Sequence, residues 1–97
     1  MISVVFSEAA ELELNDAAAH YEVETVGLGV AFIVEVEKAT RLLSENVALG
    51  QLVTADVRKW PLPRFPYALI YKVSGAELRI LAVANFRRRP FYWRGRT

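Results

Sequence analysis

Hydrophobic residues in the first half of the chain follow the spacing of helices. Residues 2–6 form a short apolar run that predicts a strand, and Ser7 after it is suited to cap a helix start. Two apolar stripes at helical spacing then follow, one made by Ala10, Leu14, Ala17 and Tyr21, the other by Leu12, Ala19, Val23 and Val26. A helix with two apolar faces is expected to lie between neighbouring elements.

A glycine segment separates this helix from a second one. Gly27-Leu28-Gly29 predicts the end of the first helix, because glycine accepts the left-handed conformation of a helix C-cap. A further stripe predicts a second helix that reaches about Glu45, with the apolar residues Phe32, Val36, Ala39 and Leu43. Since the link is short, the two helices are expected to form an antiparallel hairpin.

After Gly50 the pattern becomes that of strands, predicted at residues 54–60, 67–73 and 77–85. Prolines 61, 63 and 66 mark the first turn, and Ser74-Gly75-Ala76 predicts a hairpin. The last strand is apolar almost throughout, which is typical of a central strand covered on both faces. The order β-α-α-β-β-β predicts an α+β fold with a helical hairpin on one side of a small, mostly antiparallel sheet. Pro90 is expected to open a short helical turn.

Length and composition narrow the class of protein. The 97 residues argue for one domain, residues 1–97, and a hydrophobic content of 54% is enough for its core. The chain has no cysteine and a single histidine, His20, so we expect no metal site and no cofactor. No stretch has the ~18 apolar residues of a membrane-spanning helix, and the lack of cysteine fits a cytoplasmic location.

Charge divides the chain into an acidic and a basic part. Residues 1–56 hold ten acids and two bases, a net −8, whereas residues 57–97 hold ten bases and one acid, a net +9. Such asymmetry points to an acidic partner for the basic part, either nucleic acid or an acidic protein segment. The alternative is that the two parts neutralise each other in the fold.

The basic part also holds the candidate functional residues, since His20 alone gives no catalytic triad and no glycine-rich phosphate loop is present. Arginine binds phosphate or carboxylate at two points, and Tyr92 and Trp93 are aromatic groups that can stack on bases. If the last three strands are neighbours, these groups are expected to converge near one edge of the sheet. Phe91 is expected in the core, Trp93 either in the core or at the site, and Tyr67 and Tyr71 in packing roles. The basic candidates are Arg58, Arg64, Arg79, Arg87, Arg88, Arg89, Arg94 and Arg96.

Three segments of the sequence resemble those of a known protein family. The segments 64–71 (RFPYALIY), 80–85 (ILAVAN) and 88–93 (RRPFYW) resemble the RelE/ParE superfamily, the toxins of bacterial type II toxin–antitoxin (plasmid stabilisation) modules. The resemblance spans essentially the whole chain and implies the fold described above.

The resemblance implies two possible activities. RelE-like members cut messenger RNA on the ribosome; carried over to this chain, the catalytic candidates are Arg58, Arg64, Arg87, Arg88 and Tyr92. ParE-like members poison DNA gyrase and are not enzymes of this kind. Ala68 stands where the cutting branch often has arginine, and Asn85 where many relatives have histidine. Because asparagine does not titrate near neutral pH, the ParE-like activity is favoured.

The resemblance also implies a cognate antitoxin whose acidic, amphipathic C-terminal segment folds on the toxin. The residues assigned to binding the target or antitoxin are Arg79, Asn85, Arg89, Trp93, Arg94 and Arg96. The target is then DNA gyrase or ribosome-bound mRNA, and no membrane is involved. A non-catalytic nucleic-acid-binding module, or an inactive relative of the toxins, stays open as a further alternative.

Overall fold

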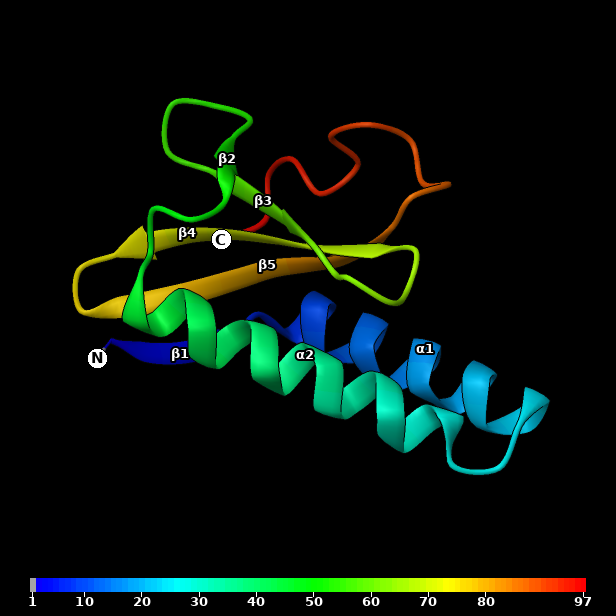
Figure 1. The fold of residues 1–97 in the computed structure, drawn as a ribbon. Helices are drawn as coiled ribbons and strands as arrows, with labels where there is room; N and C mark the ends of the chain where they lie inside the picture. Colours follow the sequence, from blue (N-terminus) through cyan, green and yellow to red (C-terminus); the bar gives the residue numbers. More distant parts are fainter. Residues whose placement is uncertain (1) are drawn as a thin grey trace.

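Two helices cover one face of a five-stranded sheet in the computed structural model, which describes residues 2–97 (Figure 1). The strand order is β1-β5-β4-β3-β2, with β1 parallel to β5 and the other pairs antiparallel. This arrangement confirms the predicted α+β fold and adds one strand to it. The elements are β1 (Ser3–Phe6), α1 (Glu8–Glu24), α2 (Leu28–Glu45), β2 (Gln51–Leu52), β3 (Arg58–Pro61), β4 (Tyr67–Ser74) and β5 (Glu77–Asn85).

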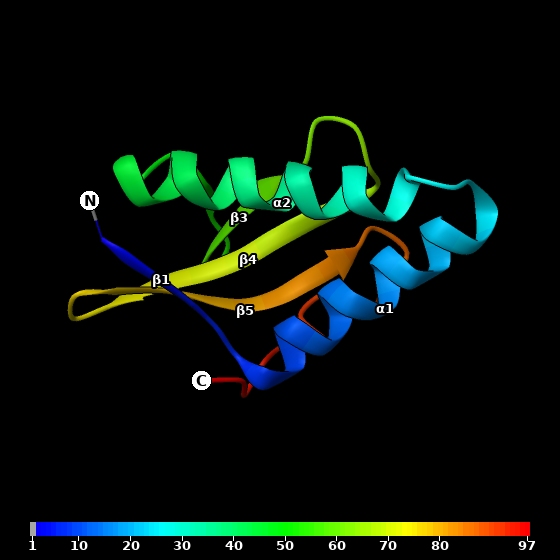
Figure 2. The same ribbon diagram turned by 90° about the horizontal axis from the view of Figure 1, so that it is seen from below.

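The helical hairpin begins as the sequence predicts, at a serine cap. Ser7 Oγ accepts a hydrogen bond from the Ala10 amide at 3.1 Å, which satisfies one of the free N–H groups at the start of α1. The same hydroxyl donates to the Leu81 carbonyl at 3.3 Å, so the cap also ties α1 to β5. Figure 1 shows both helices below the sheet, and Figure 2, seen from below, shows them joined at one end as a hairpin whose arms spread apart.

The glycine segment has a different role from the one predicted. α1 ends at Glu24 with Thr25 as its C-cap, so the expectation of a glycine C-cap is wrong. Gly27, at φ 89°, is instead the N-cap of α2, and Glu22 accepts hydrogen bonds from the amides of Gly27 and Gly29 at 2.9 and 3.0 Å. A carboxylate at this helix start opposes the positive end of the helix dipole. A Cβ on Gly29 would lie 2.5 Å from the Ala18 carbonyl oxygen, so close helix packing requires glycine there.

The strand predicted at residues 54–60 is wrong in its bounds, because a loop interrupts it. The Thr54 hydroxyl accepts from the Val57 amide at 3.2 Å, and the Val53 amide donates to the Val57 carbonyl at 2.8 Å. A side chain that bonds to the nearby backbone competes with the ladder of a sheet. The segment therefore turns back on itself and leaves two short strands, β2 and β3, as a hairpin.

Strand β5 is buried on both faces, which confirms the expectation of a central strand. Its helix-side residues Leu78, Ile80 and Val83 join the core beneath the helices, where Tyr71 and Tyr67 also pack. The pairing of β5 with β4 has a bulge at Leu81. Leu81, Ala82 and Ala84 belong to a cluster on the face of the sheet away from the helices. The second side is therefore a small apolar cluster of its own, which includes Val57, Ile70 and Trp93.

The C-terminal tail, residues 86–97, covers this second cluster from the side opposite the helices (Figure 1). It runs through successive turns, so the predicted helical turn at Pro90 is wrong. Trp93 is the buried aromatic, with 7% of its surface exposed, whereas Phe91 is 41% exposed and has φ 61°. The expectation of a core Phe91 is therefore wrong, because the turns direct only one of these rings at the sheet.

Candidate functional site

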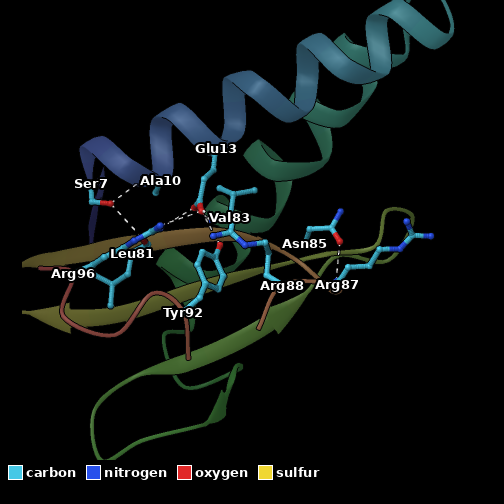
Figure 3. A network of polar contacts seen from close by, with 10 residues as sticks. All are labelled: Ser7, Ala10, Glu13, Leu81, Val83, Asn85, Arg87, Arg88, Tyr92 and Arg96. Atoms are coloured by element: carbon cyan, nitrogen blue, oxygen red, sulfur yellow. Dashed lines mark hydrogen bonds and ion pairs between the residues drawn. The ribbon is translucent and has the colours of Figure 1, made fainter. Parts of the chain in front are cut away.

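One carboxylate joins the tail to the sheet and to α1. Glu13 Oε1 accepts from Arg96 Nη1 at 2.9 Å and from the Val83 amide at 3.0 Å, and Oε2 accepts from the Tyr92 hydroxyl at 2.7 Å and from Arg96 Nη2 at 3.2 Å (Figure 3). Arg88 adds its guanidinium 4.0 Å from Oε2. We call Glu13, Arg88, Tyr92 and Arg96 the Glu13 cluster. Such two-point arginine contacts are among the stronger charge-assisted hydrogen bonds.

The place of the Glu13 cluster follows from the length of β1. The pairing of β1 with β5 ends at Phe6 opposite Ile80, so the later residues of β5 lack a strand neighbour on this side. Polar side chains hydrogen-bond to the backbone groups of β5 that no strand pairs with. Ser7 and Arg96 donate to the Leu81 carbonyl, and Glu13 accepts from the Val83 amide. Buried backbone groups need such partners, so the network completes an edge that β1 leaves unfinished.

The contacts with Glu13 shift the pKa of Tyr92 and of Arg96. Burial, and next the hydrogen bond to Glu13, raise the pKa of the Tyr92 hydroxyl far above its usual value of 10.0. The hydrogen bond to Glu13 likewise raises the pKa of Arg96. Tyr92 is therefore a neutral donor at physiological pH, already bound to a carboxylate.

The arginine run, Arg87 to Arg89, lies just past the end of β5 and is exposed. Arg88 stacks on the Tyr92 ring, with its guanidinium carbon 3.9 Å from the ring centroid. Asn85 Oδ1 accepts from the Arg87 amide at 2.8 Å, which shapes the turn, and Figure 3 shows the Arg87 side chain pointing away from the Glu13 cluster. Together with Tyr92, the three arginines line a hollow at this end of the molecule.

A second hollow, here called the tail hollow, lies between the tail and the sheet and has a volume of about 290 Å³. Its floor is apolar and comes from the strands: Ala68, Ile70 and Ala84. Its basic lining residues are Lys59, Arg88 and Arg89. Phe86 and Phe91 also line it, exposed by 54% and 41%. The arrangement suits a ligand that carries negative charge and apolar or aromatic surface.

The predicted convergence of the basic residues is wrong for three of them. Arg58 Nη1 donates to the Gly50 carbonyl at 2.7 Å, near the far end of β4. Arg64 lies 3.5 Å from Glu35 of α2, which places it against the helices. Arg79 pairs with Glu77 at 3.2 Å and donates to the Thr97 carbonyl. The alternative of internal neutralisation therefore describes Arg64, Arg79 and Arg96 better than a docking surface does, and Arg58 is held by backbone carbonyls.

The remaining candidates do share one end of the molecule. Arg87, Arg88, Arg89 and Tyr92 line one hollow, and Asn85 and Trp93 line the tail hollow beside it. Arg94 is exposed, with its guanidinium 5.0 Å from the centroid of the Phe91 ring. Trp93, for which both a core and a binding role were open, is buried in the second cluster.

Glu13 is the residue that sequence reasoning missed. It is one of several glutamates in the first helical segment, and nothing near it in the sequence distinguishes it from the others. Its partners lie about eighty positions away in the tail, at Tyr92 and Arg96, so no local pattern points to it. Glu13 is 17% exposed in the structure.

Comparison with known proteins agrees with this architecture. A solved structure described as the chromosomal ParDE TA system from P. aeruginosa superposes with a TM-score of 0.74 at 22% identity, covering 88% of this chain and 96% of that one. No curated relative matches the chain. The two chains thus share a fold.

The family follows from the sequence match. The family model described as the ParE toxin of the type II toxin–antitoxin system parDE matches residues 4–90, and the chain belongs to this family. The match confirms the resemblance and the favoured ParE-like assignment, and a parDE system implies a cognate antitoxin. Within residues 2–97, neither helix is long and apolar enough to cross a membrane.

Proposed function

We propose that this toxin acts in the cytoplasm as a single domain and arrests growth by poisoning DNA gyrase. The observation that carries the proposal is the engagement of Tyr92, whose hydroxyl donates to Glu13 at 2.7 Å and keeps its proton because its pKa is raised. A general acid or base needs a pKa near the working pH and must reach the substrate. Tyr92 meets neither condition, and Asn85 beside it does not titrate.

The RelE-like alternative is less well supported by the geometry. Of its five candidate residues, only Arg87, Arg88 and Tyr92 lie together, whereas Arg58 and Arg64 are held elsewhere by Gly50 and Glu35. What remains of the five candidates is a cationic surface with a tyrosine whose hydroxyl is held by Glu13. Such a surface can bind a macromolecule, but the five candidates include no free group to activate a ribose hydroxyl.

The proposed inhibitor is an acidic, amphipathic segment of the cognate antitoxin, bound at the tail hollow. The apolar floor at Ala68, Ile70 and Ala84 would receive its hydrophobic side chains. Its carboxylates would face Lys59, Arg88 and Arg89 at the rim. In this proposal Asn85, Arg89 and Arg94 contact the partner or the target, whereas Arg79, Trp93 and Arg96 act by shaping the tail.

The experiment is a supercoiling assay with purified gyrase and relaxed plasmid. Free toxin is expected to block supercoiling and to trap cleaved plasmid, and the antitoxin is expected to reverse both effects. Tyr92→Phe is expected to act like the wild type, since it removes a structural hydrogen bond to a carboxylate, worth about 1.5–3 kcal/mol, and no catalytic group. Gyrase that supercoils normally at excess toxin would refute the proposal. Harmless overexpression would instead favour an inactive relative or a binding module.

A further inference from the structure

Unpaired cations and exposed aromatic rings lie at the tail hollow and beside it. Lys59, Phe86, Arg89 and Phe91 line this hollow, Arg87 lines the neighbouring hollow, and Arg94 lies against the Phe91 ring. We propose that the surface made by these six residues binds single-stranded DNA directly. The inference rests on the proposed function, because it gives the toxin its own contact with the DNA that gyrase handles. It adds to that function a ligand chemistry: phosphates together with unpaired bases.

The ion pairs separate this surface from the basic residues that have a carboxylate partner within the fold. Glu13 offsets Arg96 and lies near Arg88, while Glu35 and Glu77 offset Arg64 and Arg79. Across residues 2–97, by contrast, no carboxylate lies within 4.0 Å of the charged groups of Lys59, Arg87, Arg89 or Arg94. Exposed cations without internal partners are the ones available to phosphate oxygens.

Two phenylalanine rings determine which polyanion fits best. Phe86 is 54% exposed, with the Lys59 ammonium 5.9 Å from its ring centroid, and Phe91 is 41% exposed, with the Arg94 guanidinium 5.0 Å from its ring. Each ring thus stands beside a cation. Unpaired bases stack on such rings, and each stacked base contributes about 1–3 kcal/mol. In a duplex the base faces are hidden, so the rings favour a single strand.

The surface is held in place before any ligand arrives. Trp93 anchors the tail in the second apolar cluster, and the Glu13 cluster fixes Tyr92, on which Arg88 stacks. The choice of DNA over RNA as the occupant comes from the proposed function, because gyrase acts on DNA.

Binding of free toxin to a labelled oligothymidine of about 12 nucleotides, followed by fluorescence anisotropy over a salt series, tests the inference. The double variant Arg87→Ala/Arg89→Ala is expected to lose about tenfold or more in affinity and to lower the slope of log K against log[salt] by about 1.4. Phe86→Ala is expected to lose about 5- to 100-fold with the slope unchanged. Arg41→Ala on α2, an exposed arginine of the opposite side, is the matched control and is expected to bind like the wild type.

The inference is overturned if free toxin does not bind the oligonucleotide, or if the double variant binds as tightly as Arg41→Ala. Tighter binding of an equal-length duplex, or of the corresponding RNA, would also overturn it. Circular dichroism melts of all variants separate lost binding from lost folding. Gyrase trapping without DNA binding by the toxin would contradict this inference alone, whereas DNA binding with gyrase unaffected would contradict only the proposed function.

Discussion

Replacing Trp93 with alanine is expected to lower the free energy of unfolding by about 3–5 kcal/mol. The indole is 7% exposed and fills the second cluster against strand residues such as Ile70, Leu81 and Ala84. Its removal leaves a cavity and also detaches the tail that covers this face of the sheet. The loss is large beside the 5–15 kcal/mol that stabilise a typical domain. Urea unfolding followed by circular dichroism measures it.

Phe91→Ala is the control for this prediction, because Phe91 lies two positions away in the same tail and is 41% exposed. We expect it to cost less than about 1 kcal/mol, as most exposed substitutions do. Similar losses for the two variants would mean that Trp93 does not anchor the tail.

Replacing Glu13 with alanine is expected to cost about 1.5–3 kcal/mol, the range for a hydrogen bond to a charged group, because the side chains of Glu13 and Arg96 are 17% and 23% exposed. The variant leaves Arg96 and Tyr92 without their acceptor and the Val83 amide without a partner. A buried donor that loses its acceptor keeps its full desolvation cost. Urea unfolding measures the total, and hydrogen exchange of the Val83 amide reports on the local effect.

The matched control is Glu37→Ala, an exposed glutamate of α2. It is expected to stay within about 0.5 kcal/mol of the wild type. If Glu13→Ala is equally neutral, and the Val83 amide exchanges no faster than before, the Glu13 cluster does not hold the tail to the sheet.

Local chemistry made most of the fold predictable from the sequence. The Ser7 cap, the end of the second helix at Glu45, the Gly75 hairpin and the doubly covered last strand each depend on residues close together in the chain. The wrong prediction at the glycine segment also concerns residues close together in the chain, but their pattern fits two structures. Glycine permits a positive φ at either end of a helix, so the pattern alone did not show that Gly27 begins α2 rather than ends α1.

The candidate site was less predictable because it depends on pairings across the whole chain. The sequence places Arg58, Arg64 and Arg79 in the same basic half as the arginine run. It does not show which carboxylate or carbonyl each of them contacts in the fold. Likewise, composition does not decide whether Phe91 or Trp93 turns inward. The turns of the tail decide it, and they lie beside Tyr92, which is held by Glu13 from the distant helix α1.

The most direct test of the central claim compares DNA and transcripts in the same cells after induction of the toxin without its antitoxin. The account predicts gyrase-linked breaks in DNA and intact ribosome-bound messages, with the same outcome for Tyr92→Phe. Messages cut within codons while plasmid supercoiling stays normal, and loss of that cutting in Tyr92→Phe, would contradict the account.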